Sequence, residues 1–469
     1  MRTYQDLIAI GEDDNARGEF CRSAVEEFKG SSDYRLAKDG EAYYNKHNVT
    51  IENFQKFLYT ISGNKVPDIF SANYRLKTLF FRRLVIQQVQ YVLGNGLKLE
   101  NKNNKAKLGR DFDFQLQTLA KRALAEGRAF GFWNYDHLEV FGYADTPTQA
   151  GFCPLYNEET SQLDAGIRFW YKTVGNELLE RYTLYEIDGI TEYSKLGNGD
   201  IELLKPKTAY KITTKKSNAG GVEDILGENY TKLPIVPMYS NDSHETELVG
   251  IRESIDCYDF IKSGLANDID DTSGFYWILK NTGGMDDVDL AKFVQRMKTI
   301  RATYVDGDSG VEVEPHTLAI PTEARKTLLD IIETDIYKDF QSLNIESLSA
   351  SAKTTQEIQS AYQSQDNKCA DFEYYVLDFV QQILELAGID DNPTFTWNRV
   401  VNQAEQTQMI LQASQYLTDE AVIKHLPFLT PEEADQIIKD RDKEDFGQFE
   451  IENEIVDRNE NVEPEEINE

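Results

Sequence analysis

The sequence has few of the residues from which metal centres, nucleophilic active sites and disulfide frameworks are built. Its 469 residues include five histidines and four cysteines. The cysteines are far apart along the chain and form no CxxC pair (Cys21, Cys153, Cys257 and Cys369). This arrangement favours reduced thiols over a disulfide framework or a zinc knuckle. The histidines are scattered, and neither GxSxG nor a Walker lysine loop occurs, so we expect a protein that is not an enzyme and needs no cofactor or metal.

Basic charge and long apolar runs are also scarce. Lys and Arg number 49 against 81 Asp and Glu, which leaves a formal charge of −32. Counterion release by a nucleic-acid binder requires clustered basic residues, so binding to a free polyanion is disfavoured. No apolar run approaches the roughly 18 residues of a membrane span, and the first residues, MRTYQDLIAI, lack the apolar core of a signal peptide. We expect a chain that folds in a cytoplasm without a membrane segment.

The apolar content, 40% of residues, is nevertheless high enough for two or three folded domains. Residues 1 to about 125 have the pattern of helices, including IENFQKFLYTI from Ile51 and DFDFQLQTLAKRALAEG up to Gly127. From there, short aromatic and β-branched runs predict antiparallel strands, with turns at Asp188-Gly189 and at Gly197-Asn198-Gly199. The region closes at KLPIVPMYSN, whose two prolines exclude a helix.

The stretch NYRLKTLFFRRLVIQQVQYVLGNGL (Asn73–Leu97) could be a helix that stops or a glycine-rich phosphate loop. Its apolar residues recur every three to five positions, which predicts one face of a helix. Gly94 stands where the end of a helix often needs a residue with positive φ. A dinucleotide loop requires a strand before the glycines and a helix after them, and the position of its third glycine is Leu99. The pattern therefore favours a helix that ends at Gly94.

The second half of the chain begins with two helices that bracket a compact insert. The first helix is predicted at 251–271, and the insert at 272–320 contains the strand FYWILKN, a turn with a short helix, and a hairpin in ATYVDGDSGVEVEPHTL. Pro321 is a favourable first residue for the second helix, which runs to 341. Each helix has an apolar stripe: Ile251, Ile255, Tyr258, Leu265 and Ile269 in the first, and Leu328, Ile332, Ile336 and Phe340 in the second.

A serine-rich polar stretch at 342–353 follows the second helix and leads into a very long one. A strand in PTFTWNRVV and two further helices, separated by HLPFLTPEEA, come next. The segment at 444–469 has eleven acidic residues and one arginine. Such a segment cannot bury enough apolar surface to fold, so we expect it to be disordered.

Three short motifs suggest metal chemistry at first sight. HETEL at His244 resembles a zinc-protease HExxH, but its fifth position is Leu248. DGDSG at Asp306 lacks the other ligands of a calcium loop and is typical of a hairpin turn. Asp268, Asp270 and Asp271 do not share a helix face, which favours solvated acids at a helix end. A metal-dependent nuclease that uses such acidic clusters stays open as an alternative function.

Four segments carry a family resemblance: YYNKHNVTI (Tyr43–Ile51), Asn73–Leu97, GRAFGFWNYD (Gly127–Asp136) and ELVGIRESIDCYDFIKSGLANDIDD (Glu247–Asp271). In this order they resemble the portal proteins of tailed bacteriophages, in particular those of siphophages with long non-contractile tails. The resemblance extends from about Tyr43 to Asn402. A non-portal virion adaptor or scaffold protein is a second alternative, but it would lack the order of helix, insert, helix and polar loop.

The resemblance implies an α+β fold and a ring, typically of about twelve subunits, at one vertex of the capsid. The ring would be the channel for packaging and ejecting double-stranded DNA. The implied regions are a wing (1–250, rich in strands from about 127), stem helices (251–271 and 321–341), a clip (272–320), a tunnel loop (342–353), a long wing helix with a strand (354–402), a crown (403–443) and the acidic tail (444–469).

The resemblance also implies which residues meet DNA and partner proteins. The tunnel-loop candidates are Ser342, Asn344, Glu346, Ser347, Ser349, Ser351 and Lys353. The candidates for stem residues that face the channel are Arg325, Lys326 and Lys338, and those for the clip interface are Trp277, Asp286, Asp287 and Asp308. The implied partners are other copies of the chain, the terminase large subunit, head–tail adaptors, and major capsid and scaffolding proteins. The implied location is the virion, after assembly in the host cytoplasm.

Overall fold

The computed structural model describes residues 2–59, 64–68, 71–216, 222–272, 276–280, 312–316, 321–344, 355–398, 403–426, 429 and 433–441. The chain forms two compact units. Unit 1 consists of Met1–Asn344 and Ser364–Asn398, and unit 2 of Ile345–Gln363 and Arg399–Glu469. The expected mixture of helices with a largely antiparallel sheet is confirmed.

The N-terminal part of unit 1 is mainly helical, as predicted. Its elements are α1 (Tyr4–Ala9), α2 (Asp14–Lys29), α3 (Ser32–Tyr44), α4 (Val49–Glu52), β1 (Phe57–Tyr59), β2 (Lys65–Pro67), α5 (Phe80–Leu93), β3 (Lys98–Leu99), α6 (Lys102–Lys105), η1 (Ala106–Leu108) and α7 (Phe112–Glu126). Capping residues explain several of the starts. Asp13 accepts hydrogen bonds from the first backbone N–H groups of α2, and Ser31 does the same for α3.

Two helix predictions in this region were wrong. IENFQKFLYTI is helical only in α4, and its later residues form β1, which pairs with β2 in an antiparallel two-stranded sheet. Residues 73–79 are not helical, and α5 begins only at Phe80. Gly94 does end α5, but its φ is −60°, and the positive φ of 72° belongs to Gly96. A Cβ at Gly94 would lie 2.3 Å from the carbonyl oxygen of Gln90, so close approach favours this glycine.

An eight-stranded sheet forms the centre of unit 1, with the strand order β10-β9-β8-β7-β6-β5-β4-β13. The strands are β4 (Arg128–Asn134), β5 (His137–Gly142), β6 (Gly151–Tyr156), β7 (Leu163–Val174), β8 (Glu177–Glu186), β9 (Gly189–Leu196), β10 (Glu202–Thr208) and β13 (Ile235–Tyr239). Every neighbouring pair is antiparallel except β5 and β6, which meet in parallel at Gly142 and Gly151. A separate antiparallel pair consists of β11 (Lys211–Lys216) and β12 (Val222–Glu228).

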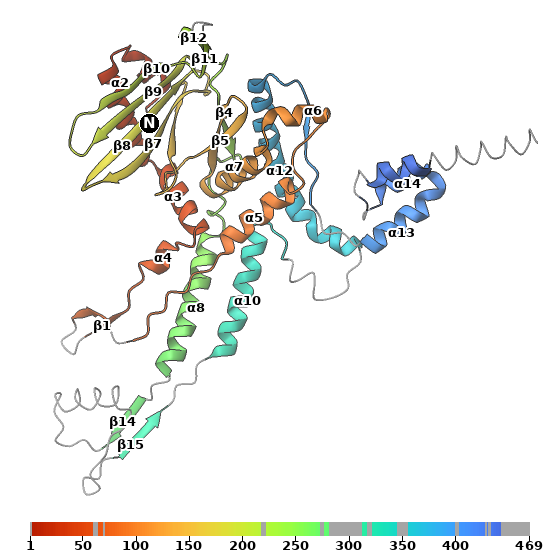
Figure 1. Ribbon diagram of the computed structural model, residues 1–469. Helices are drawn as coiled ribbons and strands as arrows, with labels where there is room; N and C mark the ends of the chain where they lie inside the picture. Colours follow the sequence, from red (N-terminus) through yellow and green to blue (C-terminus); the bar gives the residue numbers. More distant parts are fainter. Residues whose placement is uncertain are drawn as a thin grey trace, which may run out of the picture. The chain divides into compact units, whose positions relative to one another are not determined.

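The sheet has helices on both faces at its β4 end (Figure 1). Because side chains alternate along a strand, Phe130 of β4 joins the buried cluster that contains Phe28 of α2. The neighbouring Gly131 faces the other way, where a Cβ would lie 2.5 Å from the ring of Phe379. Phe379 belongs to α12 (Thr355–Ala387), so β4 is packed between α2 and α12. Helix–sheet–helix layering explains why β4 is almost entirely buried.

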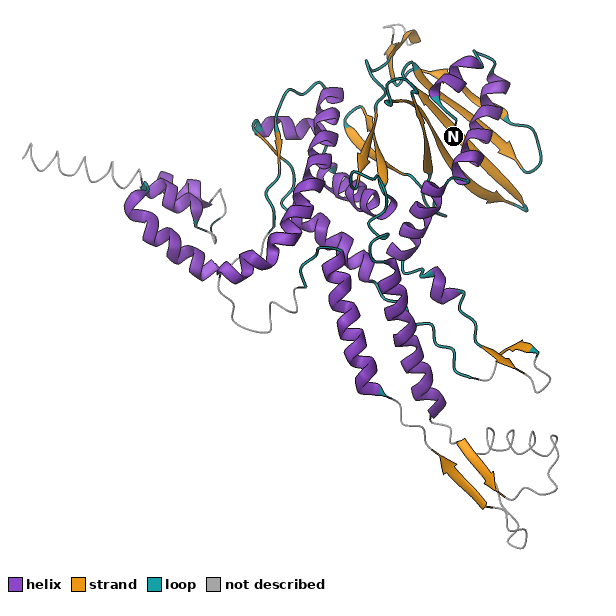
Figure 2. Cartoon of the chain, turned by 180° about the vertical axis from the view of Figure 1, so that it is seen from behind, coloured by secondary structure: helices purple, strands orange, loops and turns teal. Residues whose placement is uncertain are grey.

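The two predicted helices around the insert are confirmed as α8 (Arg252–Thr272) and α10 (Thr322–Asp339), with Pro321 as the N-cap rather than the first helical residue. Figure 2 shows them side by side. In the insert, β14 (Tyr276–Lys280) confirms the expected strand. Its antiparallel partner is β15 (Glu312–His316), which was expected to pair within its own local hairpin. The insert's expected short helix and the DGDSG motif lie outside the described residues.

The very long helix is confirmed as α12, which is followed by Gly388 with a φ of 68°. The strand expected in PTFTWNRVV is reduced to β16 (Pro393–Thr394), which pairs with β3. Asp391 stabilises this junction by accepting hydrogen bonds from the backbone N–H groups of Glu100 and Asn101. The hydrogen bond that Asn104 Nδ2 donates to Asp391 at 2.9 Å lowers the pKa of Asp391 most, and the backbone bonds lower it further, because both favour its ionised form.

Unit 2 is helical over its described residues. It contains α13 (Gln403–Ala413), η2 (Ser414–Tyr416), α14 (Asp419–His425) and a helical segment at 433–441. Thr418 caps α14, and Arg441 pairs with Asp419 at 3.2 Å. The acidic tail at 444–469 lies outside the described residues.

Candidate functional site

The pair formed by α8 and α10 is the first candidate feature, and it is anchored to the rest of unit 1 near one end. Phe80 of α5, which is 2% exposed, makes edge-on ring contacts with Tyr258 of α8 and Tyr337 of α10. Farther along the pair, Arg325 of α10 lies 2.5 Å from the carboxylate of Asp268 of α8. The two helices are therefore joined by aromatic contacts at one end and by an ion pair at the other.

The predicted apolar stripes are only partly buried, so this expectation needs correction. Ile255 and Ile336 are buried near the anchored end. In contrast, Ile269 is 54% exposed and Leu328 is 44% exposed, and Ile331, on the same side of α10 as Leu328, is 52% exposed. Unit 1 packs against only one end of the pair. The described residues of the chain therefore leave apolar surface on the remaining length open to another molecule.

An extended segment runs antiparallel along α8, and we name it the strap (residues 73–79). The backbone N–H of Thr78 donates to Asp259 Oδ1 at 2.9 Å. The N–H of Leu76 donates to Ser263 Oγ at 2.9 Å. The N–H of Tyr74 donates to Asn267 Oδ1 at 2.6 Å. Alternate residues of the strap are thus matched to every fourth residue of α8.

The three receiving side chains are buried, and burial explains why they are polar. Asp259 is 0% exposed, Ser263 7% and Asn267 3%. Without these three acceptors, the buried backbone N–H groups of the strap would have no hydrogen-bond partner, which would cost free energy of folding. Asp259 also accepts a hydrogen bond from Asn48 Nδ2 at 3.0 Å. Burial nevertheless raises the pKa of Asp259, because desolvation outweighs these hydrogen bonds.

Sequence reasoning missed the strap, although α8 contains a signal for it. The predicted stripe continued from Ile251 and Ile255 through apolar residues of α8. In the structure, the buried residues after Ile255 are instead the three polar acceptors of the strap, Asp259, Ser263 and Asn267, which follow at intervals of four. A polar residue at a buried helix position requires a hydrogen-bond partner. The partner lies far away in the sequence, so the pattern alone does not identify it.

The start of the polar loop after α10 is fixed to unit 1. Gln341 has a φ of 59°, and the backbone N–H of Ser342 donates to the carbonyl of Tyr337, which closes the end of the helix. Leu343 is 8% exposed, and its N–H donates to Gln365 Oε1 of α12 at 3.0 Å. Gln87 of α5 donates to the carbonyl of Leu343 at 2.8 Å. Leu343 is therefore part of the subunit's own core.

A lysine of α12 completes this anchor. Lys368 Nζ donates to the carbonyl oxygen of Phe340 at 2.9 Å and lies 3.5 Å from the centre of the Phe340 ring. It also lies 2.5 Å from the carboxylate of Glu247, which precedes α8. The side chains of Lys368 and Glu247 are only 15% and 13% exposed. One ammonium group thus links α12, the end of α10 and the entrance to α8.

The structure places some of the predicted site residues and leaves others outside its described part. Arg325 is engaged with Asp268, Lys326 is exposed, and Lys338 is exposed and lies 3.9 Å from Asp335. Ser342 and Asn344 are half-buried at the anchored start of the loop, and Trp277 lies in β14 opposite Pro315. Eight predicted residues lie outside the described residues: Glu346, Ser347, Ser349, Ser351, Lys353, Asp286, Asp287 and Asp308.

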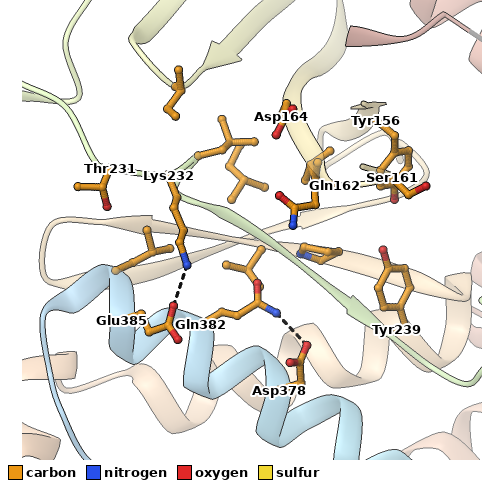
Figure 3. A pocket seen from close by; sticks show the side chains of 17 residues that line it. Tyr156, Ser161, Gln162, Asp164, Thr231, Lys232, Tyr239, Asp378, Gln382 and Glu385 are labelled. Carbon is orange, nitrogen blue, oxygen red and sulfur yellow. Dashed lines mark hydrogen bonds and ion pairs between the residues drawn. The ribbon is translucent and has the colours of Figure 1, made fainter. Parts of the chain in front are cut away.

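A cavity of about 620 Å³ lies between β13, the turn after β6 and α12 (Figure 3). Lys232 points towards Glu385 and pairs with it at 3.0 Å. Gln382 donates to Asp378 at 2.8 Å on the same side. Among the described residues that line the cavity, none is a histidine or a cysteine. Two pairs of its polar groups thus bond each other, and the described lining residues form no recognisable acid–base or nucleophilic arrangement.

The described part of the chain has neither a metal-binding cluster nor a membrane-spanning helix. Within the described ranges, no group of three or more His, Cys, Asp or Glu side chains is arranged to hold a metal ion. His244 of HETEL has a φ of 57° in a loop, with its ring stacked on Tyr239, and burial lowers its pKa. No helix in the described part of the chain combines the length and the hydropathy that crossing a bilayer requires.

Comparison with known proteins decides the family. Residues 33–445 match the family described as phage portal protein, SPP1 Gp6-like. The chain belongs to this family of phage portal proteins. The match continues well beyond Gln403, where the resemblance found in the sequence ended. A portal is the ring at one capsid vertex through which DNA is packaged and to which other virion components attach, and this is the role of the family.

Individual relatives agree with the family. The chain is 24% identical over 428 residues to the portal protein of Clostridium phage phiCD119, covering 86% of this chain and 91% of the relative. It is 22% identical over 421 residues to the portal protein of Bacillus phage SPP1, covering 84% and 81%.

Two solved structures are also similar, each at 11% identity. One is a chain in the neck of an empty gene transfer agent particle, with a TM-score of 0.40, covering 73% of this chain and 88% of that one. The other is a chain in the virion of a native gene transfer agent particle, with a TM-score of 0.37 and coverages of 74% and 85%.

Proposed function

We propose that copies of this chain close into a ring, of about twelve subunits as the resemblance implies, and that double-stranded DNA passes through its centre. The family match over residues 33–445 carries this proposal. Unit 1 around the eight-stranded sheet is assigned to the wing. The helices α8 and α10 are assigned to the stem, and the insert at 272–320 to the clip. The remaining assignments are the tunnel loop at 342–353 and the crown at 403–443.

The charge of the chain fits a channel rather than a binding site. DNA phosphates are attracted to clustered Lys and Arg, and each such contact would slow passage. The helices α8 and α10 together contain eleven acidic and five basic residues. A wall with this charge repels phosphate and leaves few positions where DNA would stop. The paired state of Arg325 with Asp268 supports the same view, because a cation held in an ion pair attracts phosphate less strongly.

The anchored start of the polar loop supports its assignment as the tunnel loop. Leu343 is held by Gln87 and Gln365, and Phe340 is held by Lys368. A loop that meets moving DNA needs a fixed base, since otherwise the whole end of α10 would move with it. The loop would then contact DNA through the residues between Asn344 and α12.

The partners follow from the same assignments. The clip would be the docking platform for the terminase large subunit during packaging and for head–tail adaptors afterwards. The wing and crown would face the major capsid and scaffolding proteins. Assembly would take place in the host cytoplasm, and the finished ring would be part of the virion. No enzymatic activity is assigned to the chain.

Two measurements test the proposal. Negative-stain imaging and mass measurement of the purified protein should give closed rings with a central hole, and compact monomers at all concentrations would refute it. The substitution Lys353→Glu, which changes the charge of the tunnel loop, should leave rings intact and reduce DNA packaging in a complementation assay. Normal rings with normal packaging would refute the loop assignment and leave the ring unaffected.

A further inference from the structure

We name the segment between α4 and the strap the arm (residues 53–72), of which the structure describes residues 53–59, 64–68 and 71–72. Its strands β1 and β2 have three residues each and pair with each other in a sheet of two strands. An isolated two-stranded ribbon is at best marginally stable in water. Phe57 is 43% exposed and Val66 is 38% exposed. The arm is therefore only marginally stable by itself and exposes apolar residues, as expected of an element that is completed by a partner.

The base of the arm is well held, so the arm is not a frayed end. Phe54 contacts Phe260 of α8 edge-on, with ring centres 5.1 Å apart. Lys56 Nζ donates to the carbonyl of Ala72 at 2.6 Å, and the N–H of Asp68 donates to the carbonyl of Lys56 at 2.9 Å. The strap follows the arm and is held along α8 by its three backbone hydrogen bonds. Both ends of the arm are therefore attached to the stem of their own subunit.

The arm and strap differ in charge from the rest of the molecule. From Asn53 to Thr78 the sequence has four basic residues and one acidic residue, in a chain with a formal charge of −32. The helices α8 and α10 have a net charge of −6 from eleven acidic and five basic residues. In a closed ring the stems of neighbouring subunits stand next to one another and repel. A basic segment between two acidic stems would offset that repulsion.

One face of α10 matches the arm residue by residue in chemical type. Leu328, Ile331 and Asp335 lie on one side of the helix because they are three and four residues apart. Leu328 and Ile331 are 44% and 52% exposed, and the side chain of Asp335 is 51% exposed. The arm offers the complement on one face of its ribbon, where exposed Pro67 pairs with Phe57, and Lys65, two residues before Pro67, has its Nζ 4.0 Å from the centre of the Phe57 ring.

We propose that the arm of one subunit docks on the α8–α10 pair of the neighbouring subunit, with Phe57 and Pro67 against Leu328 and Ile331 and with Lys65 facing Asp335. This inference rests on the proposed ring and names a contact that holds it together. Each subunit gives an arm to one neighbour and receives an arm from the other. The contact is heterologous, and such contacts close into rings when the rotation between subunits allows it.

Disulfide trapping in assembled rings tests the contact. The exposed native thiol is removed by Cys257→Ser, while Cys21, Cys153 and Cys369 are buried. Rings are then formed from an equal mixture of P67C chains and L328C chains and treated with a mild oxidant. We expect covalent dimers on a denaturing gel from the mixture and none from either variant alone. A mixture of P67C with V174C chains, whose second introduced thiol is on β7, is the matched control.

The outcomes separate the contact from the ring itself. Rings that form normally and give no dimers beyond the control would overturn the docking and leave the proposed function standing. A P67C/L328C double variant that traps only within one chain, seen as a monomer of altered mobility, would also overturn it. Failure of the parent Cys257→Ser chain to form any ring would count against the proposed function instead.

A charge reversal gives a second, independent test. K65E should lower the fraction of subunits in rings at least several-fold at low ionic strength, and added salt should restore it, because salt screens the new repulsion. K172E changes the net charge equally on β7, where the side chain is exposed, and should behave like the wild type. Equal ring fractions for K65E and K172E across the salt series would overturn the proposed contact.

Discussion

Replacing Lys368 by methionine should loosen the base of the polar loop and destabilise unit 1. Methionine keeps most of the side-chain volume, so the change removes chiefly the ammonium group. That group donates to the Phe340 carbonyl and pairs with Glu247 at 2.5 Å. Breaking a buried ion pair by removing one partner costs about 3–5 kcal/mol, because the other charge is left uncompensated. Here the side chains retain 15% and 13% exposure, and Asn241 still donates to Glu247, so we expect about 2–3 kcal/mol.

A double-mutant cycle isolates this ion pair from the loss of the other contacts. In K368M/E247Q the buried carboxylate is absent as well, and the amide oxygen can still accept from Asn241. The double variant should therefore recover about 1–2 kcal/mol relative to K368M alone. K172M, at an exposed site on β7, is the matched control and should change stability by less than about 0.5 kcal/mol.

The assay is urea unfolding at one fixed subunit concentration, because assembly stabilises the folded chain in a concentration-dependent way. Hydrogen exchange gives the local measurement. The N–H groups of Ser342 and Leu343, which are hydrogen-bonded in the anchor, should lose protection in K368M. A wild-type unfolding midpoint together with unchanged exchange at these two residues would refute the assigned role of Lys368.

Three further predictions concern other parts of the chain. G40A should destabilise the folded chain by about 1–3 kcal/mol, since its Cβ would lie 1.9 Å from the carbonyl oxygen of Ala125. A Cβ at Gly264 would meet nothing within 4 Å, so G264A should be neutral or stabilising in thermal melts. D259N should destabilise at every pH, because its amide faces Asn48 Nδ2. Burial raises the pKa of Asp259 above its value in the unfolded chain, which is about 3.9. The wild type therefore gains stability relative to D259N as the pH falls through the folded-state pKa towards that value. The difference between the urea midpoints of the two proteins should widen on acidification. A constant gap would contradict this sign. Ring formation by the wild type should strengthen with salt, which screens repulsion beyond roughly 8–10 Å, and mass measurements that show rings dissociating as salt rises would contradict it.

Elements whose partners are local could be predicted from the sequence. The alternation of aromatic and β-branched residues after Gly127 indicated antiparallel strands, and the turns at Gly189 and Gly197 occur with positive φ. The ends of α7 and α12 were also predictable, since Gly127 and Gly388 adopt positive φ after them. In each case the decisive interaction lies within a few residues of the pattern.

Elements whose partners are distant could not be predicted in this way. Residues 73–79 have an apolar spacing that suits a helix, but backbone bonds to α8 hold them extended. The anchor at Lys368 joins three segments that are separated in the sequence. The family resemblance identified the order of the regions, but neither it nor the periodicity indicated that Leu343 is buried within the subunit.

The strap also limits how α8 can move. Two residues of an extended chain advance by about 6.6 Å, and four residues of an α-helix advance by about 6.0 Å. The two repeats are nearly equal in length, so three successive hydrogen bonds between the strap and α8 form without strain. The accumulated mismatch would disturb a much longer series of such bonds. A small slide or rotation of α8 would break all three hydrogen bonds at once. A slide by four residues of α8 would bring Leu76 opposite Asp259 or Asn267. The three hydrogen bonds of the strap therefore hold α8 at one axial position, and any displacement of this helix along the strap would have to break them together.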